Sequence, residues 1–152
     1  MKIGVVSDTH GLLRPEVTLA LAGVERILHL GDVGDDGILR ELGKIAPVTA
    51  VKGNVDRDGE CSRLPETEIF EVQGISIYLL HVIDHLDLDP KTAGFSAVLF
   101  GHSHKAEIRR HKDVLYFNPG SCGPRRFQLP VTIGFLHIGT DGRLEPEIVE
   151  LG

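Results

Sequence analysis

The sequence has no excess of positive charge, few cysteines and no long apolar segment. Among its 152 residues, 16 are lysine or arginine and 22 are aspartate or glutamate, which gives a net charge of −6. Non-specific binding to nucleic acid or to an anionic membrane is therefore not expected. The two cysteines, Cys61 and Cys122, have neither zinc-site nor redox-motif spacing. They indicate free thiols in a reducing compartment.

A targeting or membrane-spanning segment is missing as well. No run approaches the roughly 20 apolar residues that a membrane-spanning helix needs. Residues 1–3 enter a strand pattern at once, without the regions of a signal peptide. We therefore expect a cytoplasmic protein with no membrane contacts. No repeat or linker divides the chain, so residues 1–152 are predicted to form one domain.

The apolar pattern predicts an α/β fold. In the first third, short apolar strands alternate with amphipathic helices, which is typical of a parallel sheet with buried faces. The expected strands there are residues 2–7, 26–30 and 48–51, with helices at 15–22 and 36–44. The rest is mostly β, apart from a short helical turn after Asp89-Pro90, with strands expected at 68–72, 75–80, 97–100, 106–110, 114–117, 131–138 and 144–150. A two-sheet sandwich with helices outside accommodates both halves.

Polar side chains follow several of these strands. Asp8 and His10 lie two residues apart at the end of the first strand, so their side chains point the same way. A carboxylate and an imidazole together suit a transition metal, although this pair alone equally fits a capping aspartate and a surface histidine. Similar donors, most of them beside a glycine, end later strands: Asp32, Asn54, His81, His102 and His104. In parallel sheets, ligands bind beyond the carboxyl ends of the strands.

This donor set predicts a dinuclear metal site. The seven oxygen and nitrogen donors exceed what one tetrahedral ion accepts, but they suit two ions that share a ligand. A carboxylate with two oxygens is the natural bridge, and Asp32 is the candidate. Two such ions can clamp a phosphoryl group and lower the pKa of a bound water from 15.7 to about 7. A serine or cysteine nucleophile is then unnecessary.

The order of these motifs resembles that of a known enzyme family. Asp8-x-His10, Gly31-Asp32, Gly53-Asn54-x-Asp56, His81 and Gly101-His102-x-His104 are similar to the motifs of the calcineurin-like metallophosphoesterases. The chain length and the segment Asn118-Pro119-Gly120-Ser121 with Pro124-Arg125 resemble the small bacterial and archaeal phosphodiesterase branch.

The resemblance implies a fold, a reaction and a ligand set. The fold would be a four-layer α/β–β/α sandwich of two mixed sheets with helices outside. The reaction would be metal-dependent hydrolysis of a phosphodiester or phosphomonoester by a metal-bound hydroxide. One ion would be held by Asp8, His10, Asp32 and His104, and the other by Asp32, Asn54, His81 and His102. Both would be divalent, with manganese usual in the family and iron, zinc, nickel, cobalt or magnesium as alternatives.

Two positions depart from the family pattern. Val55 stands where many relatives have a histidine that assists the leaving group, although this branch often lacks it. We therefore expect better activity on esters with acidic leaving groups. Val82 stands where relatives usually have glycine after the position of His81, and His85 could reach back toward the substrate or be a surface residue.

Arginines near the last motif are further candidates for substrate binding. Arg125 and Arg126 could bind phosphate through two parallel hydrogen bonds. The alternative is solvated surface charge. Arg14, near the first ligand loop, is a weaker candidate.

Other functions compete with the enzyme hypothesis. One is a non-catalytic scaffold of the same fold, similar to the retromer subunit that resembles these enzymes. Another is a single-metal or regulatory protein, which would leave half of the histidines without a role. All seven donor positions are filled, which favours the enzyme. The expected partner is a small phosphate ester, either a nucleotide diester, cyclic or not, or a phosphomonoester. Relatives suggest a homo-oligomer.

Overall fold

A computed structural model describes residues 1–151 of the protein. The first third alternates strand and helix as expected, in the order β1 (Lys2–Val6), α1 (Pro15–Ala20), β2 (Arg26–His29), α2 (Asp36–Gly43) and β3 (Val48–Ala50). Pro15 begins α1, where its missing N–H costs no hydrogen bond. The Asp35 carboxylate caps α2 by accepting a 2.9 Å hydrogen bond from Gly37 N. Helix α1 ends two residues earlier than the predicted Ala22, since Leu21 is already its C-cap.

The remainder is mostly strand. Its elements are η1 (Glu60–Arg63), β4 (Thr67–Val72), β5 (Ile75–Leu80), η2 (Ile83–His85), α3 (Pro90–Ala93), β6 (Ala97–Leu99), β7 (Glu107–His111), β8 (Val114–Asn118), β9 (Thr132–Ile138) and β10 (Leu144–Glu150). The two 3-10 turns, η1 and η2, were not anticipated from the sequence because neither has a repeated apolar stripe.

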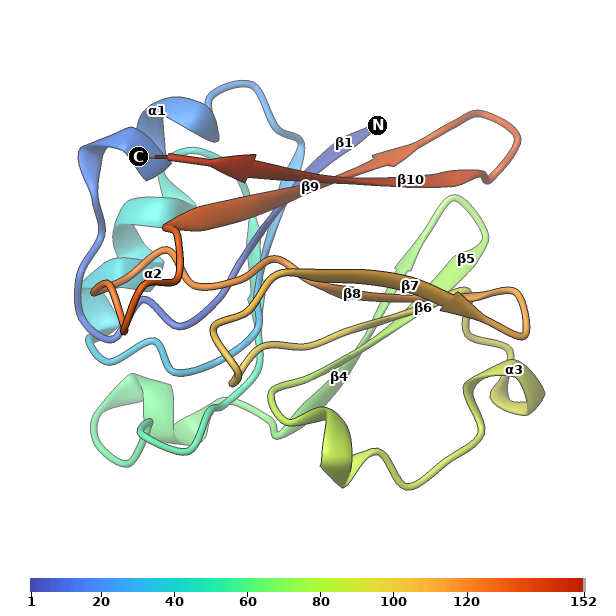
Figure 1. Ribbon diagram of the computed structural model, residues 1–152, viewed down its shortest axis with the longest axis horizontal. Coiled ribbons are helices and arrows are strands. Elements are labelled where there is room, and N and C mark those ends of the chain that lie inside the picture. The colour runs from blue at the N-terminus through green and yellow to red at the C-terminus, as the bar shows by residue number, and fades with distance from the viewer. Residues whose placement is uncertain (152) are drawn as a thin grey trace.

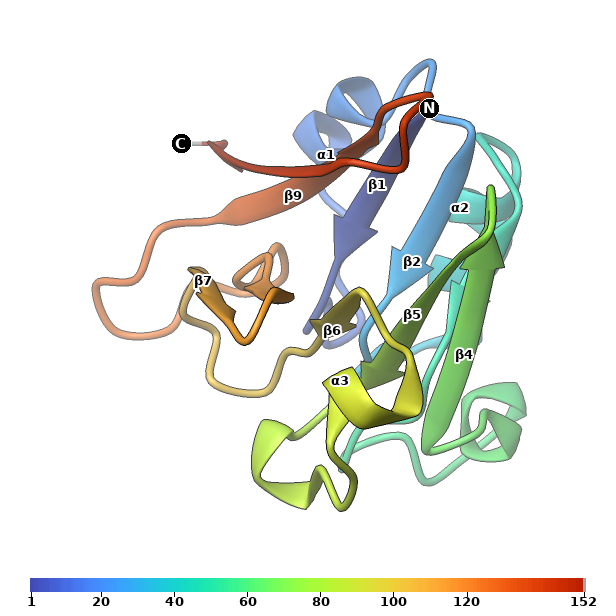
Figure 2. The ribbon, with the colours of Figure 1, turned by 90° about the vertical axis from the view of Figure 1, so that its right-hand side faces the viewer.

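The strands form two mixed five-stranded sheets. Sheet A has the order β10-β9-β1-β2-β3, and sheet B has the order β4-β5-β6-β8-β7. Strands β1, β2 and β3 run parallel, as do β5, β6 and β8. In sheet A, β9 runs antiparallel to both of its neighbours, β10 and β1. In sheet B, the two outer pairs, β4–β5 and β7–β8, are antiparallel. Figure 1 shows the two sheets one above the other, and Figure 2 shows them from the side.

Three apolar clusters separate four layers. Helices α1 and α2 pack on the outer face of sheet A through Val17, Ile38 and Leu42. The central core lies between the sheets and includes Val5 and Phe117. A third cluster lies on the outer face of sheet B, where it is covered by four side chains of the 83–95 segment, Ile83, Leu86, Leu88 and Phe95. The predicted four-layer sandwich is confirmed, but this outermost layer contains only η2 and the single-turn α3 (Figure 2).

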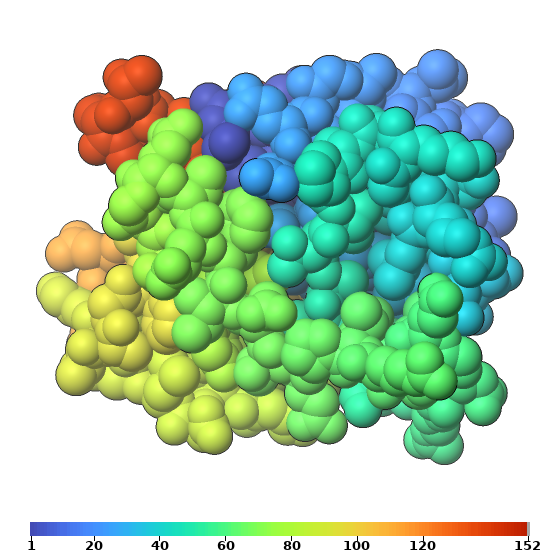
Figure 3. Space-filling view, turned by 180° about the vertical axis from the view of Figure 1, so that it is seen from behind, coloured from blue at the N-terminus to red at the C-terminus, as the bar shows by residue number. Residues whose placement is uncertain are grey.

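The loops and the outer layers of this packing form the surface of the molecule. The space-filling view shows the face where the teal segment near residue 50 borders green segments that follow it in the chain (Figure 3). No helix among residues 1–151 is long and apolar enough to cross a membrane.

Candidate metal centre

The carboxyl ends of strands from both sheets meet at one place. The turn after β1 is tied to the turn after β2 by a 3.0 Å hydrogen bond from Asp8 N to Gly31 O. It is tied to sheet B by a 3.1 Å hydrogen bond from His102 N to Asp8 Oδ2. The loops that carry the predicted ligands therefore converge between the two sheets.

The first group of donors is Asp8, His10 and His104, whose ligand atoms all lie within 4.8 Å of one another. The Nε2 atoms of His10 and His104 lie 3.3 Å apart. Asp8 Oδ1 lies 3.4 Å from His104 Nε2 and 3.7 Å from His10 Nε2. Asp8 and His104 are buried, while His10 is half-buried and faces the opening.

The second group is Asp32, His81 and His102, again within 4.8 Å. Asp32 Oδ2 lies 3.2 Å from His81 Nε2. The rings of His81 and His102 meet edge to face with their centroids 5.2 Å apart. Asn54 is exposed and lines a cavity together with His81. The first group contains three residues of the first predicted ligand set, and the second group contains three residues of the second set. Asp32, which the prediction assigns to both sets, is in the second group.

Asp32 lies between the two groups. Its Oδ2 is 3.5 Å from His10 Nε2 in the first group, besides its contact with His81 in the second. Its Oδ1 accepts a 3.0 Å hydrogen bond from Val55 N, which fixes the plane of the carboxylate. The same oxygen of Asp32 thus lies near a histidine of each group.

Three buried side-chain atoms have no hydrogen-bond partner among residues 1–151: His104 Nδ1, Asp8 Oδ1 and His81 Nε2. Of these, Asp8 Oδ1 and His81 Nε2 face the donor groups. The other ends of these side chains are held: Asp8 Oδ2 accepts from Ser7 Oγ at 2.6 Å, and His81 Nδ1 donates to Leu30 O at 2.7 Å. With its proton on Nδ1, His81 presents the Nε2 lone pair to the site. Buried polar atoms without partners are costly, so these residues fit divalent metal ions.

The site places carboxylates beside histidines, and each kind of group shifts the pKa of the other. Burial disfavours the ionised form of Asp8, but hydrogen bonds and charges from His10, His104, His81 and Ser7 outweigh it and hold the Asp8 pKa far below its ordinary range. The Asp32 pKa is lowered for the same reason, against burial, by His81 and the amide of Val55. In turn, the nearby carboxylate of Asp8 raises the pKa of His10, and Asp32 raises that of His81 against the effect of burial. Metal binding would displace the protons that these histidines hold.

A buried histidine supports the ligand loops. His29 Nδ1 accepts a hydrogen bond from Gly31 N at 3.2 Å. Its Nε2 therefore carries the proton and donates to Thr9 Oγ1 at 3.0 Å, and Thr9 Oγ1 donates to Val33 O. Complete burial lowers the pKa of His29 to about 4, so the ring is neutral. His29 thus joins the turns that carry Asp8, His10 and Asp32.

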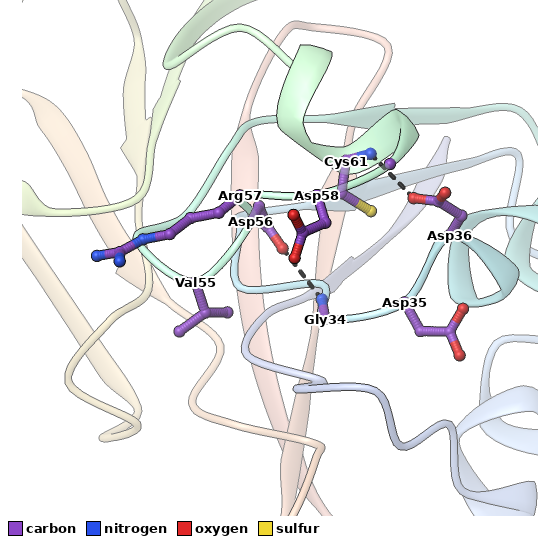
Figure 4. Close-up of a pocket in the computed structure, with 9 residues that line it drawn as sticks. Gly34, Asp35, Asp36, Val55, Asp56, Arg57, Asp58 and Cys61 are labelled. Carbon is purple, nitrogen blue, oxygen red and sulfur yellow. Dashed lines mark hydrogen bonds between the residues drawn. The ribbon is translucent and has the colours of Figure 1, made fainter.

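Asp56 supports the site from a neighbouring pocket of about 240 Å³. Its carboxylate accepts hydrogen bonds from three backbone amides, those of Val33, Gly34 and Gly53. Figure 4 shows Asp56 turned toward Gly34, with Val55 and Arg57 pointing elsewhere. Asp36 accepts in the same way from the amides of Glu60 and Cys61. These carboxylates hold loops together.

The segment 118–123 braces the ligand loops from the other side. Asn118 Nδ2 donates to Gly101 O at 3.1 Å, and Ser121 Oγ donates to Asp8 O at 3.0 Å. Arg14, the weaker candidate for phosphate binding, is engaged within the brace: its Nε and one terminal nitrogen both donate to Gly123 O at 3.2 Å. The turn Asn118-Pro119-Gly120-Ser121 can be recognised in the sequence. The loops to which it is hydrogen-bonded cannot.

The remaining candidates lie at the rim. Arg125 and Arg126 are exposed, and the positive charge of Arg126 acts on His10, where it lowers the pKa against the larger effect of Asp8. His85 is exposed and lines the same cavity as His81 and Asn54.

Several ligand positions have a left-handed backbone. Residues other than glycine with positive φ include Asp8 (58°), His10 (46°), Asp32 (56°), His102 (72°) and His104 (65°). Such conformations are uncommon for side chains with a Cβ and cluster at functional sites. Sequence reasoning gave no indication of this.

Comparisons with known proteins agree with this geometry. Residues 1–141 match the family model described as the calcineurin-like phosphoesterase superfamily domain. A protein named "Probable metallophosphoesterase" from Methanothermobacter thermautotrophicus is 34% identical over 167 residues, which cover 100% of this chain and 94% of the relative. The phosphodiesterase MJ0936 of Methanocaldococcus jannaschii is 31% identical over 157 residues, which cover 90% of this chain and 92% of the relative.

A solved structure shares the fold at lower identity. Vacuolar Protein Sorting 29 from Cryptosporidium parvum superposes with a TM-score of 0.79 at 17% identity, covering 99% of this chain and 97% of that chain. At this identity the likeness concerns the fold alone.

Proposed function

Because the chain belongs to the calcineurin-like phosphoesterase superfamily, we propose that it is a metal-dependent phosphodiesterase with a dinuclear centre. The observation that carries the proposal is the position of Asp32, whose Oδ2 lies 3.5 Å from His10 Nε2 and 3.2 Å from His81 Nε2. A carboxylate oxygen between two histidine-containing groups is what two ions sharing a ligand require.

The first ion would be held by Asp8, His10, Asp32 and His104, and the second by Asp32, Asn54, His81 and His102. When bound, the ions supply Lewis acidity, which activates water and neutralises the phosphoryl oxygens. Manganese is the ion we propose, with iron, zinc, nickel, cobalt or magnesium as alternatives, since affinity alone does not select the working ion. The free cysteines, both buried, support a reducing, cytoplasmic location.

The protein residues hold this centre and leave one side open. Ser7 and the amide of His102 orient Asp8, and the Leu30 carbonyl fixes the His81 tautomer. Arg126 would attract the phosphate anion at the rim, with Arg125 beside it in the chain. Val55 is 43% exposed and has no ionisable group, so no side chain at this position can donate a proton to the leaving group. Esters with acidic leaving groups are the expected substrates of choice.

The test is hydrolysis of bis(p-nitrophenyl) phosphate by chelator-stripped protein, with and without added Mn²⁺. We expect turnover only with the ion, and a loss of at least about a hundredfold in Asp32→Asn, because the bridge then has one oxygen and no charge. Circular dichroism of the variant controls for folding. Metal-dependent turnover that Asp32→Asn retains would contradict the bridging role.

A second candidate function is that of a non-catalytic scaffold, because the fold is similar to that of Vacuolar Protein Sorting 29. A scaffold can lose metal ligands without harm, whereas here every predicted ligand position is filled. Tight metal binding without turnover of any phosphate ester, with any divalent ion, would favour the scaffold.

A further inference from the structure

A cavity of about 410 Å³ begins at the second donor group and extends away from it. His81 and Asn54, two of the proposed metal ligands, line it. Its floor is the outer face of β5, where Tyr78 and Leu80 alternate with Ile77 and Leu79, which face the core between the sheets. A volume of this size is within the range of small-molecule sites. It is therefore open to a group attached to a phosphate held at the metal centre.

The floor of the cavity includes one aromatic side chain with a polar group, Tyr78. Tyr78 is 8% exposed and rests against Phe95, with ring centroids 5.0 Å apart, so its orientation is fixed by packing. Its hydroxyl makes no hydrogen bond within residues 1–151. A rigid aromatic ring with an unused hydroxyl suits a planar ligand that can also form a hydrogen bond.

The rim of the cavity disfavours a second anion. It carries the carboxylates of Glu66 and Asp87 and the ammonium group of Lys52, besides His85. The Lys52 Nζ is already directed to Ser62 O at 3.5 Å. Two carboxylates accept hydrogen bonds from hydroxyl or amino groups but repel a second phosphate. The preferred group is thus uncharged, ring-bearing and rich in hydrogen-bond donors.

From these features we propose that the cavity binds a nucleoside group of the phosphoester, with its ring against Tyr78 and its donor groups toward Glu66 and Asp87. The inference rests on the proposed function, because the phosphate that anchors the nucleoside is placed at the metal centre. It adds that the substrate class is a nucleotide ester without a second phosphate group on the nucleoside.

The test measures binding, so that it does not depend on turnover. Mn²⁺-loaded protein is titrated calorimetrically with methyl phosphate, which fills only the metal centre, and with thymidine 5′-monophosphate, which adds the nucleoside. We expect the nucleotide to bind at least about tenfold more tightly, in line with the strength of stacking on an aromatic side chain. Thymidine 3′,5′-bisphosphate should bind more weakly than the monophosphate.

Two variants with matched controls locate the effect. Tyr78→Leu should reduce the preference for the nucleotide to about twofold, whereas Tyr116→Leu should retain it. Tyr116 is also 8% exposed in the same outer cluster, but it lies under Arg109 and outside the cavity. Glu66→Lys should reverse the order of mono- and bisphosphate, whereas Glu71→Lys, with the same change of net charge, should not.

The outcomes separate this inference from the proposed function. Equal affinities for methyl phosphate and the nucleotide, or a preference that survives both Tyr78→Leu and Glu66→Lys, would overturn the nucleoside site even if phosphodiesters are hydrolysed. A preference lost in those variants, without turnover of bis(p-nitrophenyl) phosphate, would leave the nucleoside site standing and refute the phosphodiesterase.

Discussion

Asp8 illustrates how individual side chains are prepared for the proposed metal centre. One of its oxygens accepts hydrogen bonds from Ser7 Oγ and His102 N, and the other faces the histidines of both donor groups without a hydrogen bond among residues 1–151. His81 is divided in the same way, with Nδ1 committed to a carbonyl and Nε2 left open. The fold thus orients Asp8 and His81 through the atoms that a metal ion would not use.

His29 gives a prediction for the dependence of stability on pH. Its folded pKa, about 4, is below the ordinary value of 6.5, so between these values the unfolded chain binds a proton that the folded chain does not. Its contribution is complete above pH 6.5 and is lost as the pH falls toward 4. Between pH 7.5 and pH 5, the free energy of unfolding should fall by about 2 kcal/mol more in the native protein than in His29→Asn.

The measurement is urea denaturation of both proteins without metal at several pH values. Asparagine does not titrate, and its amide oxygen can replace Nδ1 as the acceptor for Gly31 N. The raised pKa values of His10 and His81 act in the opposite direction, but both proteins share them. Parallel stability curves would show that His29 is not kept neutral by the fold.

At the scale of elements, the ligands lie in turns that follow strands, and these turns are in close contact. A Cβ added to Gly53 would collide with Asp32 N and Oδ1, and one added to Gly101 would collide with Ser7 Oγ and lie 2.8 Å from Asp8 Oδ2. Glycine at these positions allows the turns from different strands to approach closely. Most of the proposed ligands in these turns have a left-handed backbone.

Gly101→Ala should therefore damage the metal centre through the backbone. The methyl group would push the turn after β6 away from Asp8, displacing His102, and we expect at least about tenfold weaker Mn²⁺ binding with about 1–3 kcal/mol lower stability. Gly43→Ala is the matched control, since no atom lies within 4 Å of its added Cβ and alanine favours the helix. Isothermal titration with Mn²⁺ measures the binding. Equal affinities in the two variants would contradict the role assigned to Gly101.

At the scale of the whole molecule, the proposed centre joins the two sheets. Four of the proposed ligands follow strands of sheet A, and three follow strands of sheet B. The first four are Asp8, His10, Asp32 and Asn54, and the other three are His81, His102 and His104. Apart from the core between the sheets, few polar contacts link these loops directly, the bond from His102 N to Asp8 being one. Metal ions held by both sets would connect the layers.

Metal removal should consequently lower the thermal stability of the entire chain. At a free Mn²⁺ concentration about a hundredfold above the dissociation constant, one ion adds about 2.7 kcal/mol to the folded state. For a chain of this size that corresponds to about 5–10 °C in Tm. Calorimetric scans with Mn²⁺ and with chelator measure the shift, and most of it should be lost in Asp32→Asn. An unchanged Tm on chelation would argue against metal ions as links between the sheets.

Local signals in the sequence were sufficient for the elements and the candidate ligands. Apolar runs gave the strands within one or two residues, because strand burial is encoded by residue type. The polar residues at strand ends identified the donor candidates, since topology places such ends at one edge of a parallel sheet. The resemblance to the metallophosphoesterases supplied the four-layer order and the pairing of the candidate ligands into two sets.

Only the tertiary structure decided which groups meet and which are already occupied. The placement of Asp32 between His10 and His81 depends on contacts between loops far apart in the chain. The sequence suggested Arg14 as a candidate for phosphate binding, and the structure shows its Nε and one terminal nitrogen hydrogen-bonded to Gly123 O. The cavity lined by Tyr78 lies between the outer face of β5 and the segment that follows this strand, a neighbourhood that the sequence did not indicate. Residue patterns record local burial and geometry, whereas distances between remote side chains follow from the packing of the whole chain.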